Sequence, residues 1–262
     1  MFFSRKKVDG EKPVVIIGLG NPGAEYEKSR HNVGFLAVDA IARKLGIGDL
    51  KQKTRFKAQI GDGNRNGQKI VLVKPQTYMN LSGEAVVAVC QFYKPDLNRV
   101  IVIYDDVDIV LGTVRVRPFG SSGTHNGMRS VTELLGTEKF PRIRIGIGQP
   151  PDYMDIRDFV LTRFADEEGV KITEAVAQAA GAALDIVVLG VEQAMNLHNR
   201  KQQKEKQAAK KQASEELAAK QQAPEERAAG QQAPEERAAI QQAPKEQEAG
   251  QETTTEQTAP KV

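Results

Sequence analysis

The sequence predicts an α/β protein: a single three-layer domain with a mixed, mostly parallel, twisted sheet flanked by helices, plus a disordered C-terminal tail. Apolar strand-like runs alternate with helical-period segments over residues 12–198, and one pair of strands forms a hairpin. No aromatic residue follows Phe164, and residues 201–262 contain only three large aliphatic side chains. Such a tail buries too little apolar surface to offset the entropy of ordering it.

The predicted elements follow from periodicity and turn residues. Residues 14–17 form a short buried strand, and a helix over 33–46 ends at a glycine, a common helix stop. Strands at 56–60 and 69–73 flank a polar, glycine-containing loop and make the hairpin. The remaining expected elements are a helix over 82–93, a buried strand over 100–104, a half-exposed strand over 112–117, a short helix over 128–135, a strand over 142–147 and a long helix over 168–190.

Composition divides the chain into three parts: a flexible N-terminus (1–11), the globular domain (12–198) and a low-complexity tail (199–262). The tail repeats the ten residues 221–230 at 231–240 and, more loosely, at 241–250. A proline in each repeat interrupts helix, and ten residues is too short a period for solenoid units. We expect the tail to be disordered; a partner-docking arm is the alternative, with a partner that the sequence does not identify.

Composition also excludes several classes of protein. The single cysteine, Cys90, rules out an internal disulfide framework and a thiolate zinc cluster, and its place on an apolar helical face favours core packing. With only three histidines, we expect no metal centre. No apolar run approaches 18 residues and the N-terminus lacks a signal-peptide core, so we expect a cytoplasmic protein without membrane spans.

Three asparagines follow or precede predicted elements of the sheet. Asn21 and Asn80 come soon after strands, and Asn126 lies in a glycine-rich stretch before a helix. Each has an ordinary explanation: a turn residue, a helix start and a left-handed turn, respectively. Together they suit recognition of a peptide-like group, because an amide offers a donor and an acceptor without charge.

His31 is the candidate base. It lies at the polar start of a helix beside Arg30, and both features disfavour the imidazolium, so we expect a neutral imidazole at pH 7. Asp105 follows a buried strand and can orient His31 if the fold brings the two together. The alternative for a lone histidine is local capping or packing.

Residues 18–23 read G-x-G-x-x-G after a strand, the pattern of a dinucleotide site. Pro22 interrupts the turn, however, and the acidic residue about 20 positions on, Asp39, lies inside a predicted helix rather than at a strand end. A nucleotide-dependent oxidoreductase is therefore a weak alternative.

A basic, glycine-rich segment indicates a polyanionic partner. No acidic residue lies between Ile109 and Thr132, and free backbone N–H groups near guanidinium groups favour phosphate. The alternative is a flexible basic loop. The arginines concerned are Arg115, Arg117, Arg129, Arg142 and Arg144.

These motifs, in this order and spacing, closely resemble the bacterial peptidyl-tRNA hydrolase family over residues 13–198. The resemblance implies hydrolysis of the ester between a peptide and the 3′-terminal ribose of tRNA, which recycles tRNA from dropped-off or stalled peptidyl-tRNA. It also implies a monomer that needs no metal or nucleotide cofactor. The matching motifs are Gly18-Leu19-Gly20-Asn21-Pro22-Gly23, Arg30-His31-Asn32-Val33-Gly34, Thr77-Tyr78-Met79-Asn80-Leu81-Ser82-Gly83, Asp105-Asp106-Val107-Asp108, His125-Asn126-Gly127 and Arg144-Ile145-Gly146-Ile147-Gly148.

Carried over by position, the resemblance makes His31 the general base that activates water and Asp105 its orienting partner. Asn21 and Asn80 would line the catalytic centre and hold the peptide backbone, and Asn126 would position water or bind the substrate main chain. The remaining assignments are Tyr26 and Met79, which would shape the cleft, and Arg115, Arg117 and Arg144, which would face tRNA phosphate.

The sequence departs from the family pattern in two places. Thr124 stands where the family usually has a second glycine before His-Asn-Gly, which adds a Cβ to a loop that can require freedom. The repeat tail has no counterpart in the family. A non-catalytic, splicing-factor-like RNA-binding protein of the same fold is the alternative function, and the retained His31, Asp105 and asparagines favour the enzyme.

Overall fold

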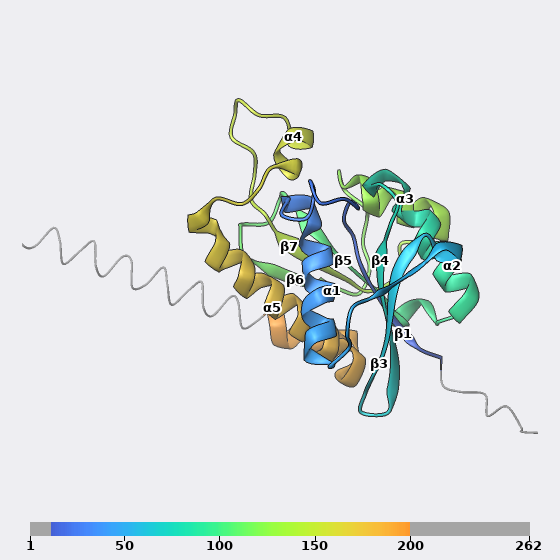
Figure 1. The fold of residues 1–262 in the computed structure, drawn as a ribbon. Helices are drawn as coiled ribbons and strands as arrows, with labels where there is room; N and C mark the ends of the chain where they lie inside the picture. The colour runs from blue at the N-terminus through green and yellow to red at the C-terminus, as the bar shows by residue number, and fades with distance from the viewer. Residues whose placement is uncertain (1–11, 200–262) are drawn as a thin grey trace, which may run out of the picture. The chain divides into compact units, whose positions relative to one another are not determined.

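A computed structural model describes residues 12–199, which form a mixed seven-stranded sheet in the order β2-β3-β4-β1-β5-β7-β6 (Figure 1). The central strands β4, β1, β5 and β7 are parallel, whereas the outer pairs β2–β3, β3–β4 and β6–β7 are antiparallel. The strands are β1 Val14–Gly18, β2 Lys51–Lys53, β3 Ala58–Arg65, β4 Gln68–Pro75, β5 Val100–Asp106, β6 Val114–Arg117 and β7 Arg142–Gly146.

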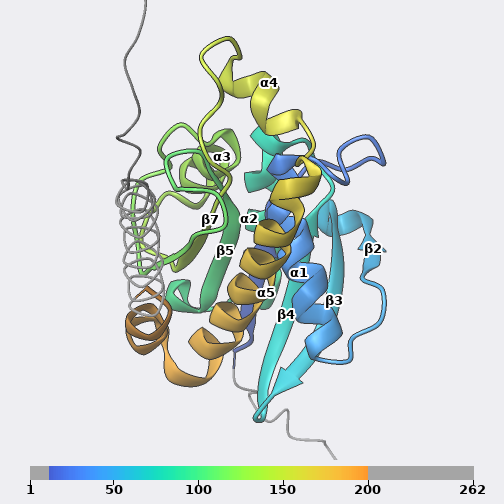
Figure 2. The ribbon, with the colours of Figure 1, turned by 90° about the vertical axis from the view of Figure 1, so that its left-hand side faces the viewer.

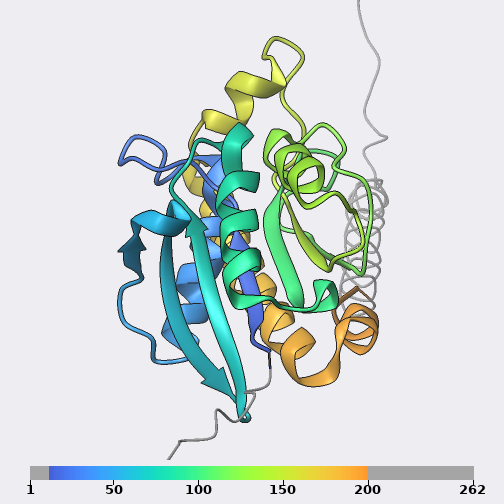
Figure 3. The ribbon, with the colours of Figure 1, turned by 90° about the vertical axis from the view of Figure 1, so that its right-hand side faces the viewer.

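Helices cover both faces of the sheet. Helices α1 and α5 pack together on one face (Figure 2), and α2 and α3 pack together on the other (Figure 3). Alternate residues of β1 point to opposite sides, so Ile16 lies in one apolar core and Ile17 in the other. The predicted three-layer α/β domain is confirmed. The α-helices are α1 Val33–Lys44, α2 Ser82–Tyr93, α3 Asn126–Leu135, α4 Ile156–Leu161 and α5 Asp166–Leu189.

The hairpin is tighter than predicted. Most of the expected loop belongs to β3, and the chain turns only at Asn66 and Gly67, whose φ values of 50° and 85° match a two-residue type I′ turn. Gly61 and Gly63 lie within strand β3. Ile47 packs where a side chain at either position would be, which explains why these residues are glycine. Glycine here allows close packing over the strand rather than marking the turn.

Other differences concern element ends and short elements. Helix α3 begins at Asn126, two residues earlier than predicted, so Asn126 does not occupy a left-handed turn. Strand β5 extends through Asp106, which places Asp105 inside the sheet rather than after it. The prediction omitted β2, α4, the helical residues 191–199 and four short 3₁₀ turns, namely η1 Arg30–Asn32, η2 Thr54–Phe56, η3 Met79–Leu81 and η4 Leu97–Arg99.

Helix α5 is longer and more apolar than the sequence analysis recognised. An 18-residue window of it has a mean hydropathy of 1.6, enough for a membrane span by length and composition alone, and half of that window is buried. Its alanine-rich side packs in the core with α1 and β7, as a core helix of a soluble fold does. The sequence analysis did not single out this helix as long and apolar enough to span a membrane, and its packing in the core accounts for its apolar composition.

The predicted flexible N-terminus (1–11) and the predicted disordered tail (199–262), apart from Asn199, lie outside the described residues and stay predictions. Cys90 is half-buried and packs against the core on the α2 side, where burial raises the pKa of its thiol to about 11, which is consistent with a packing role.

Candidate active site

The candidate site lies where the carboxyl ends of β1, β4 and β5 meet the start of α1, the usual ligand-binding edge of a parallel sheet. A glycine allows the start of α1 to lie close to the ends of these strands. A Cβ on Gly34 would lie 2.4 Å from the carbonyl oxygen of Leu19 and 2.5 Å from that of Ile103. The turn that carries His31 is therefore seated directly on the ends of two strands.

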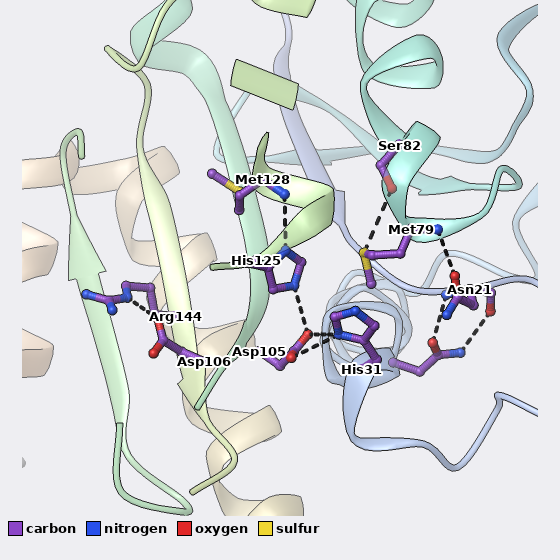
Figure 4. Close-up of polar contacts among 10 residues, drawn as sticks. Asn21, His31, Met79, Ser82, Asp105, Asp106, His125, Met128 and Arg144 are labelled. Carbon is purple, nitrogen blue, oxygen red and sulfur yellow. Dashed lines mark hydrogen bonds and ion pairs between the residues drawn. The ribbon is translucent and has the colours of Figure 1, made fainter. Parts of the chain in front are cut away.

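His31 and Asp105, 74 residues apart in the sequence, form a buried pair (Figure 4). The Nδ1 atom of His31 lies 2.8 Å and 3.0 Å from the two carboxylate oxygens of Asp105. A carboxylate accepts hydrogen bonds, so Nδ1 carries the proton and Nε2 keeps its lone pair. The tertiary contact on which the predicted base depends is thus present.

The pair also sets the charge states. Burial by itself raises the pKa of Asp105, but the imidazoles of His31 and His125 outweigh burial and hold the pKa of that carboxyl far below its usual range. Burial by itself lowers the pKa of His31, and the charge and hydrogen bond of Asp105 outweigh it, so the pKa of His31 is raised. The expected shift toward the neutral imidazole was therefore wrong in direction.

Arg30 does not act on His31 as expected, because its charge is neutralised elsewhere. Its guanidinium donates to both carboxylate oxygens of Glu168 at 3.1 Å and 2.6 Å and is nearly buried. It also lies 4.4 Å from the ring centre of Phe159 and 4.7 Å from that of Phe164. Arg30 anchors the start of α5 to η1 rather than repelling a proton from the neighbouring imidazole.

His125 is a site residue that the sequence prediction missed. Its Nε2 lies 3.0 Å from Oδ1 of Asp105, and its Nδ1 accepts from the backbone N–H of Met128 at 3.1 Å. Since Nδ1 is an acceptor, a neutral His125 holds its proton on Nε2 and donates it to Asp105. The His-Asn-Gly motif contained this signal, but only the sheet shows that one carboxylate serves two imidazoles.

The three side chains His31, Asp105 and His125 are also of types that bind metals, with candidate ligand atoms within 4.8 Å of one another. In the structure, these atoms take part in hydrogen bonds with one another and with the backbone instead. Met128 occupies one nitrogen of His125, so the other nitrogen carries a proton, and Asp105 accepts from both rings. The donor set therefore fits a hydrogen-bonded network, and the expected absence of a metal remains a prediction.

Asn21 is fixed by three hydrogen bonds. Its Oδ1 accepts from the backbone N–H of Met79 at 2.7 Å, which leaves its Nδ2 group as the free donor. The side chain of Asn32, which is buried beside His31, accepts from the N–H of Asn21 at 2.8 Å and donates to its carbonyl at 3.0 Å. Asn32 is a second functional candidate that the prediction missed, although it stood within the quoted motif.

The other four residues predicted to bind the substrate differ in how deeply they are buried and in the elements that carry them. Met79 is buried and packs against the start of α3, since a Cβ on Gly127 would lie 2.4 Å from its sulfur. Asn80 in η3 and Asn126 at the start of α3 are exposed on elements that contact each other. Tyr26 is half-buried in the turn before η1, where its backbone bonds to Gly23 and Ser29.

A cleft of about 500 Å³ opens beside the pair. Its walls include His31, Asp105 and Asn126, the glycine-rich loop 119–124 and residues 155–157. Asn21, Met79 and Asn80 are not among the residues that line this cleft, and Asn21 and Met79 lie on the other side of His31 from Asp105 (Figure 4). The predicted residues are thus divided between an amide side and a cleft side, with the imidazole between them.

The cleft side carries the arginines. Cross-strand pairing sets Arg115 opposite Arg144 and Arg117 opposite Arg142, so all four side chains belong to one face of β6 and β7. Arg117 and Arg144 line the cleft, and Arg144 forms an ion pair with Asp106, whereas Arg115 lies outside the lining. Arg142 is almost fully buried and donates to the carbonyls of Ser121 and Glu138, which supports the loop.

Thr124 does not strain this loop. The left-handed positions are Gly120 and Gly123, with φ values of 154° and 56°, and Thr124 is not among the residues of positive φ. The residue that replaces the family's second glycine is exposed. The departure from the family pattern is therefore compatible with the observed loop.

The parallel strands and the buried imidazole–carboxylate pair define an α/β protein with a candidate general base at the carboxyl ends of its strands. The family model for peptidyl-tRNA hydrolase matches residues 15–207, and the chain belongs to this family. It is 53% identical over 185 residues to the peptidyl-tRNA hydrolase of Caldanaerobacter subterraneus subsp. tengcongensis, covering 71% of this chain and 98% of that relative.

Two further relatives support the assignment. The peptidyl-tRNA hydrolase of Chloroflexus aurantiacus is 50% identical over 186 residues, again covering 71% of this chain and 98% of the relative. The crystal structure of peptidyl-tRNA hydrolase from Acinetobacter baumannii superposes with a TM-score of 0.67 at 36% identity, covering 71% of this chain and 93% of that one. The resemblance inferred from the motifs is confirmed.

Proposed function

We propose that this protein hydrolyses the ester between a peptide, or an N-blocked aminoacyl group, and the 3′-terminal ribose of tRNA. The observation that carries the proposal is the buried His31–Asp105 contact of 2.8 Å, in a chain of this family, beside an open cleft. The protein would act as a cytoplasmic monomer without a metal or nucleotide cofactor and recycle tRNA from dropped-off or stalled peptidyl-tRNA.

In the proposed first step, Nε2 of His31 takes a proton from water as the oxygen adds to the ester carbonyl. The negative charge of Asp105 stabilises the imidazolium that forms, as it already does by raising the pKa of His31. The tetrahedral intermediate then releases the ribose 3′-oxygen, which takes the proton from His31. The products are a free carboxylic acid and a tRNA with an intact terminal hydroxyl.

The amide side of the site would hold the peptide. Because Met79 occupies Oδ1 of Asn21, the Nδ2 group of Asn21 is left to donate to a substrate carbonyl or to the developing oxyanion. Asn80 is exposed beside it and can bind the peptide backbone. We assign Met79 and Tyr26 to the shape of this side, and Asn126, at the cleft, to a water molecule or the substrate main chain.

The cleft side would hold the tRNA. Arg117 and Arg144 line the cleft and Arg115 lies on the same face, so the three guanidinium groups can face phosphate oxygens. Their distance from the amide side separates recognition of the nucleic acid from recognition of the peptide. This division matches a substrate that carries a polyanion on one side of the scissile ester and a neutral chain on the other.

The test is release of an N-acetylated amino acid from N-acetyl-aminoacyl-tRNA, with and without a chelator. A positioned general base contributes roughly 10²–10⁴ in rate, so His31→Ala should lose about that much in kcat while still binding tRNA. His198→Ala, which changes a histidine paired with Asp185 outside the site, is the matched control and should keep its kcat. Chelator should not change the rate.

A wild-type protein that binds tRNA in a salt-dependent way but hydrolyses no ester would overturn the proposal. That result would support the alternative, a non-catalytic RNA-binding protein. The arginine face fits both functions, whereas a buried, oriented imidazole is needed only for catalysis.

A further inference from the structure

The cleft wall includes an exposed aromatic side chain, that of Phe119. This side chain lines the cleft and is 65% exposed, whereas Tyr104, the tyrosine of the same lining, is buried. Among residues 12–199, no aromatic ring packs against Phe119. The ring of Phe119 is therefore available to a ligand that enters the cleft.

The backbone on both sides of Phe119 is held in place. Arg117, two residues earlier, belongs to β6 and pairs with Arg142 of β7. Gly120, the next residue, donates its N–H to the carbonyl of Glu138 at 3.4 Å, and the Arg142 guanidinium donates to the same carbonyl at 2.8 Å. An ordered backbone thus presents the ring, which reduces the entropy lost when a ligand binds.

Strand β6, which leads to Phe119, also has a partner on its other edge. The helical residues 191–199 follow α5 and bring Asn199 to this strand. The side chain of Asn199 accepts from the N–H of Val116 at 3.0 Å and donates to the carbonyl of Val116 at 3.1 Å. The strand is therefore bonded on one edge to β7 and on the other to Asn199, three residues before the exposed ring.

The surroundings of Phe119 are basic. Arg117 and Arg144 line the same cleft. Arg144 is paired with Asp106, whereas no ion pair within the described part of the chain joins Arg117 to an acidic side chain. An exposed aromatic ring beside uncompensated cations is typical of sites for single-stranded nucleic acid, where the ring stacks on a base and the cations contact phosphates.

We propose that the ring of Phe119 stacks on an unpaired base at the 3′ end of tRNA, while Arg117 contacts a neighbouring phosphate. The 3′ end of tRNA is single-stranded, so its bases can turn a face to an aromatic side chain. His31 lines the same cleft, which has a volume of about 500 Å³, enough for a nucleotide. This inference rests on the proposed function for the identity of the RNA.

A tryptophan at position 119 tests the stacking directly. The sequence contains no tryptophan, so Phe119→Trp introduces a single indole, whose fluorescence is quenched when a base stacks on it. The probe is the unesterified trinucleotide CCA, and the control probe is an abasic trinucleotide with the same sugars and phosphates. The control variant is Phe92→Trp, at a phenylalanine of α2 that is 53% exposed and lies outside the cleft lining. CCA alone should quench Phe119→Trp, and neither probe should quench Phe92→Trp.

Affinity for CCA, measured by anisotropy of a 5′-labelled probe, gives a second readout. Phe119→Ala should bind about tenfold more weakly, and Phe119→Tyr should bind as the wild type does. Phe119→Leu, which is apolar but lacks a ring, should resemble the alanine variant. The salt dependence should keep its slope in these variants, whereas Arg117→Gln should make it shallower, because only that change removes a phosphate contact.

Several results would overturn the proposal. Wild-type affinity for CCA in Phe119→Ala would do so, and so would an equal loss of affinity for the abasic probe, because the ring would then not act by stacking. Absence of CCA binding by the wild-type protein would also contradict it. AMP bound as tightly as CCA would indicate a free nucleotide as the ligand in place of RNA.

These measurements involve no ester hydrolysis, so they are independent of the proposed activity. On N-acetyl-aminoacyl-tRNA, Phe119→Ala should lower kcat/KM about tenfold through a higher KM, because stacking binds the ground state and the transition state alike. N-acetyl-aminoacyl-adenosine carries the reacting ester without any phosphate. Failure of the wild-type protein to hydrolyse either ester would count against the proposed activity, and the binding of CCA would still decide the role of Phe119.

Discussion

Asp105 is the shared acceptor of the site, because its carboxylate accepts hydrogen bonds from both His31 and His125. It is buried within β5, where an isolated charge would be costly. The two imidazoles make the ionised form favourable, and the ionised form in turn keeps Nδ1 of His31 protonated. Each group therefore fixes the state of the other.

The pH profile should show this coupling. A general base acts only when unprotonated, so kcat/KM should fall as pH decreases through the raised pKa of His31. Asp105→Asn removes the charge that raises this pKa, so the acidic limb should move to lower pH while the plateau falls by about 10²–10⁴. Rates across pH 5–9 check this, and an unshifted limb in the variant would contradict it.

Asn32 provides a second prediction at this scale. Its amide bonds both main-chain groups of Asn21, so Asn32→Ala leaves two buried polar groups unpaired, at about 1–3 kcal/mol each, and frees the Asn21 amide to move. Turnover should fall at least about tenfold, the loss expected when a catalytic donor is misplaced. Affinity for uncharged tRNA should not change, because the cleft side is untouched.

Two comparisons sharpen this test. Asn98→Ala, an exposed asparagine in η4, is the control and should leave kcat unchanged. Asn32→Asp keeps an acceptor for the N–H of Asn21 but places an oxygen against its carbonyl. An Asn32→Asp variant with wild-type kcat would show that the two hydrogen bonds between Asn32 and the backbone of Asn21 do not position Asn21.

At the scale of elements, η1 and α5 are joined by Arg30 and Glu168. Glu168 accepts from Arg30 and from the N–H of Ala165, so it serves both the ion pair and the first turn of α5. Burial by itself raises the pKa of Glu168, and these contacts outweigh it and lower that pKa. The turn that carries His31 is therefore attached to the helix that covers the same face of the sheet.

Loss of this link should destabilise the domain. Glu168→Ala leaves Arg30 buried without its carboxylate, at a cost of about 3 kcal/mol, measurable by urea unfolding. Because the folded-state pKa of Glu168 is lowered, its contribution is present above the unfolded-state pKa and disappears as pH falls through the folded-state value. A double variant, Arg30→Met with Glu168→Leu, should lose less stability than Glu168→Ala alone.

The elements show what local sequence can predict. Helix α2 was predicted with its observed ends, since its apolar periodicity is a property of the segment itself. Strand β2 was missed because its three residues are exposed and polar, and only pairing with β3 makes it a strand. Arg142 was predicted to face phosphate but is buried beneath the loop. Its guanidinium donates to the backbone carbonyl of Ser121, and the local sequence does not show that this carbonyl lies within reach.

At the scale of the whole molecule, sheet order explains what the sequence could and could not show. Strand β1 lies between β4 and β5, so residues at the carboxyl ends of three separate strands converge on one edge. The individual motifs could be read from the chain, whereas the contact of Asp105 with two histidines requires this order. From the residues alone, His31 was a candidate base with local capping or packing as the alternative, and the family resemblance added its role as the activator of water.

The candidate catalytic side chains and the predicted tail lie in separate parts of the chain, so truncation of the tail should not affect catalysis. Deletion of the chain after Arg200 should leave kcat unchanged on N-acetyl-aminoacyl-adenosine, because the candidate catalytic side chains all lie within the described residues. Any loss should instead appear in the affinity for tRNA. Steady-state rates on the minimal ester and on the full substrate distinguish the two, and a large fall in kcat on the ester would show that the domain extends further.

Within residues 12–199, strand β6 is the last strand of the sheet and has a neighbouring strand on one side only. An open strand edge invites another chain to add to the sheet, and aggregation commonly begins there. The Asn199 amide imitates one residue of such a neighbour, since it satisfies both the N–H and the carbonyl of Val116. A chain that stops before Asn199 would expose this edge, and we expect it to self-associate although its candidate catalytic groups remain complete.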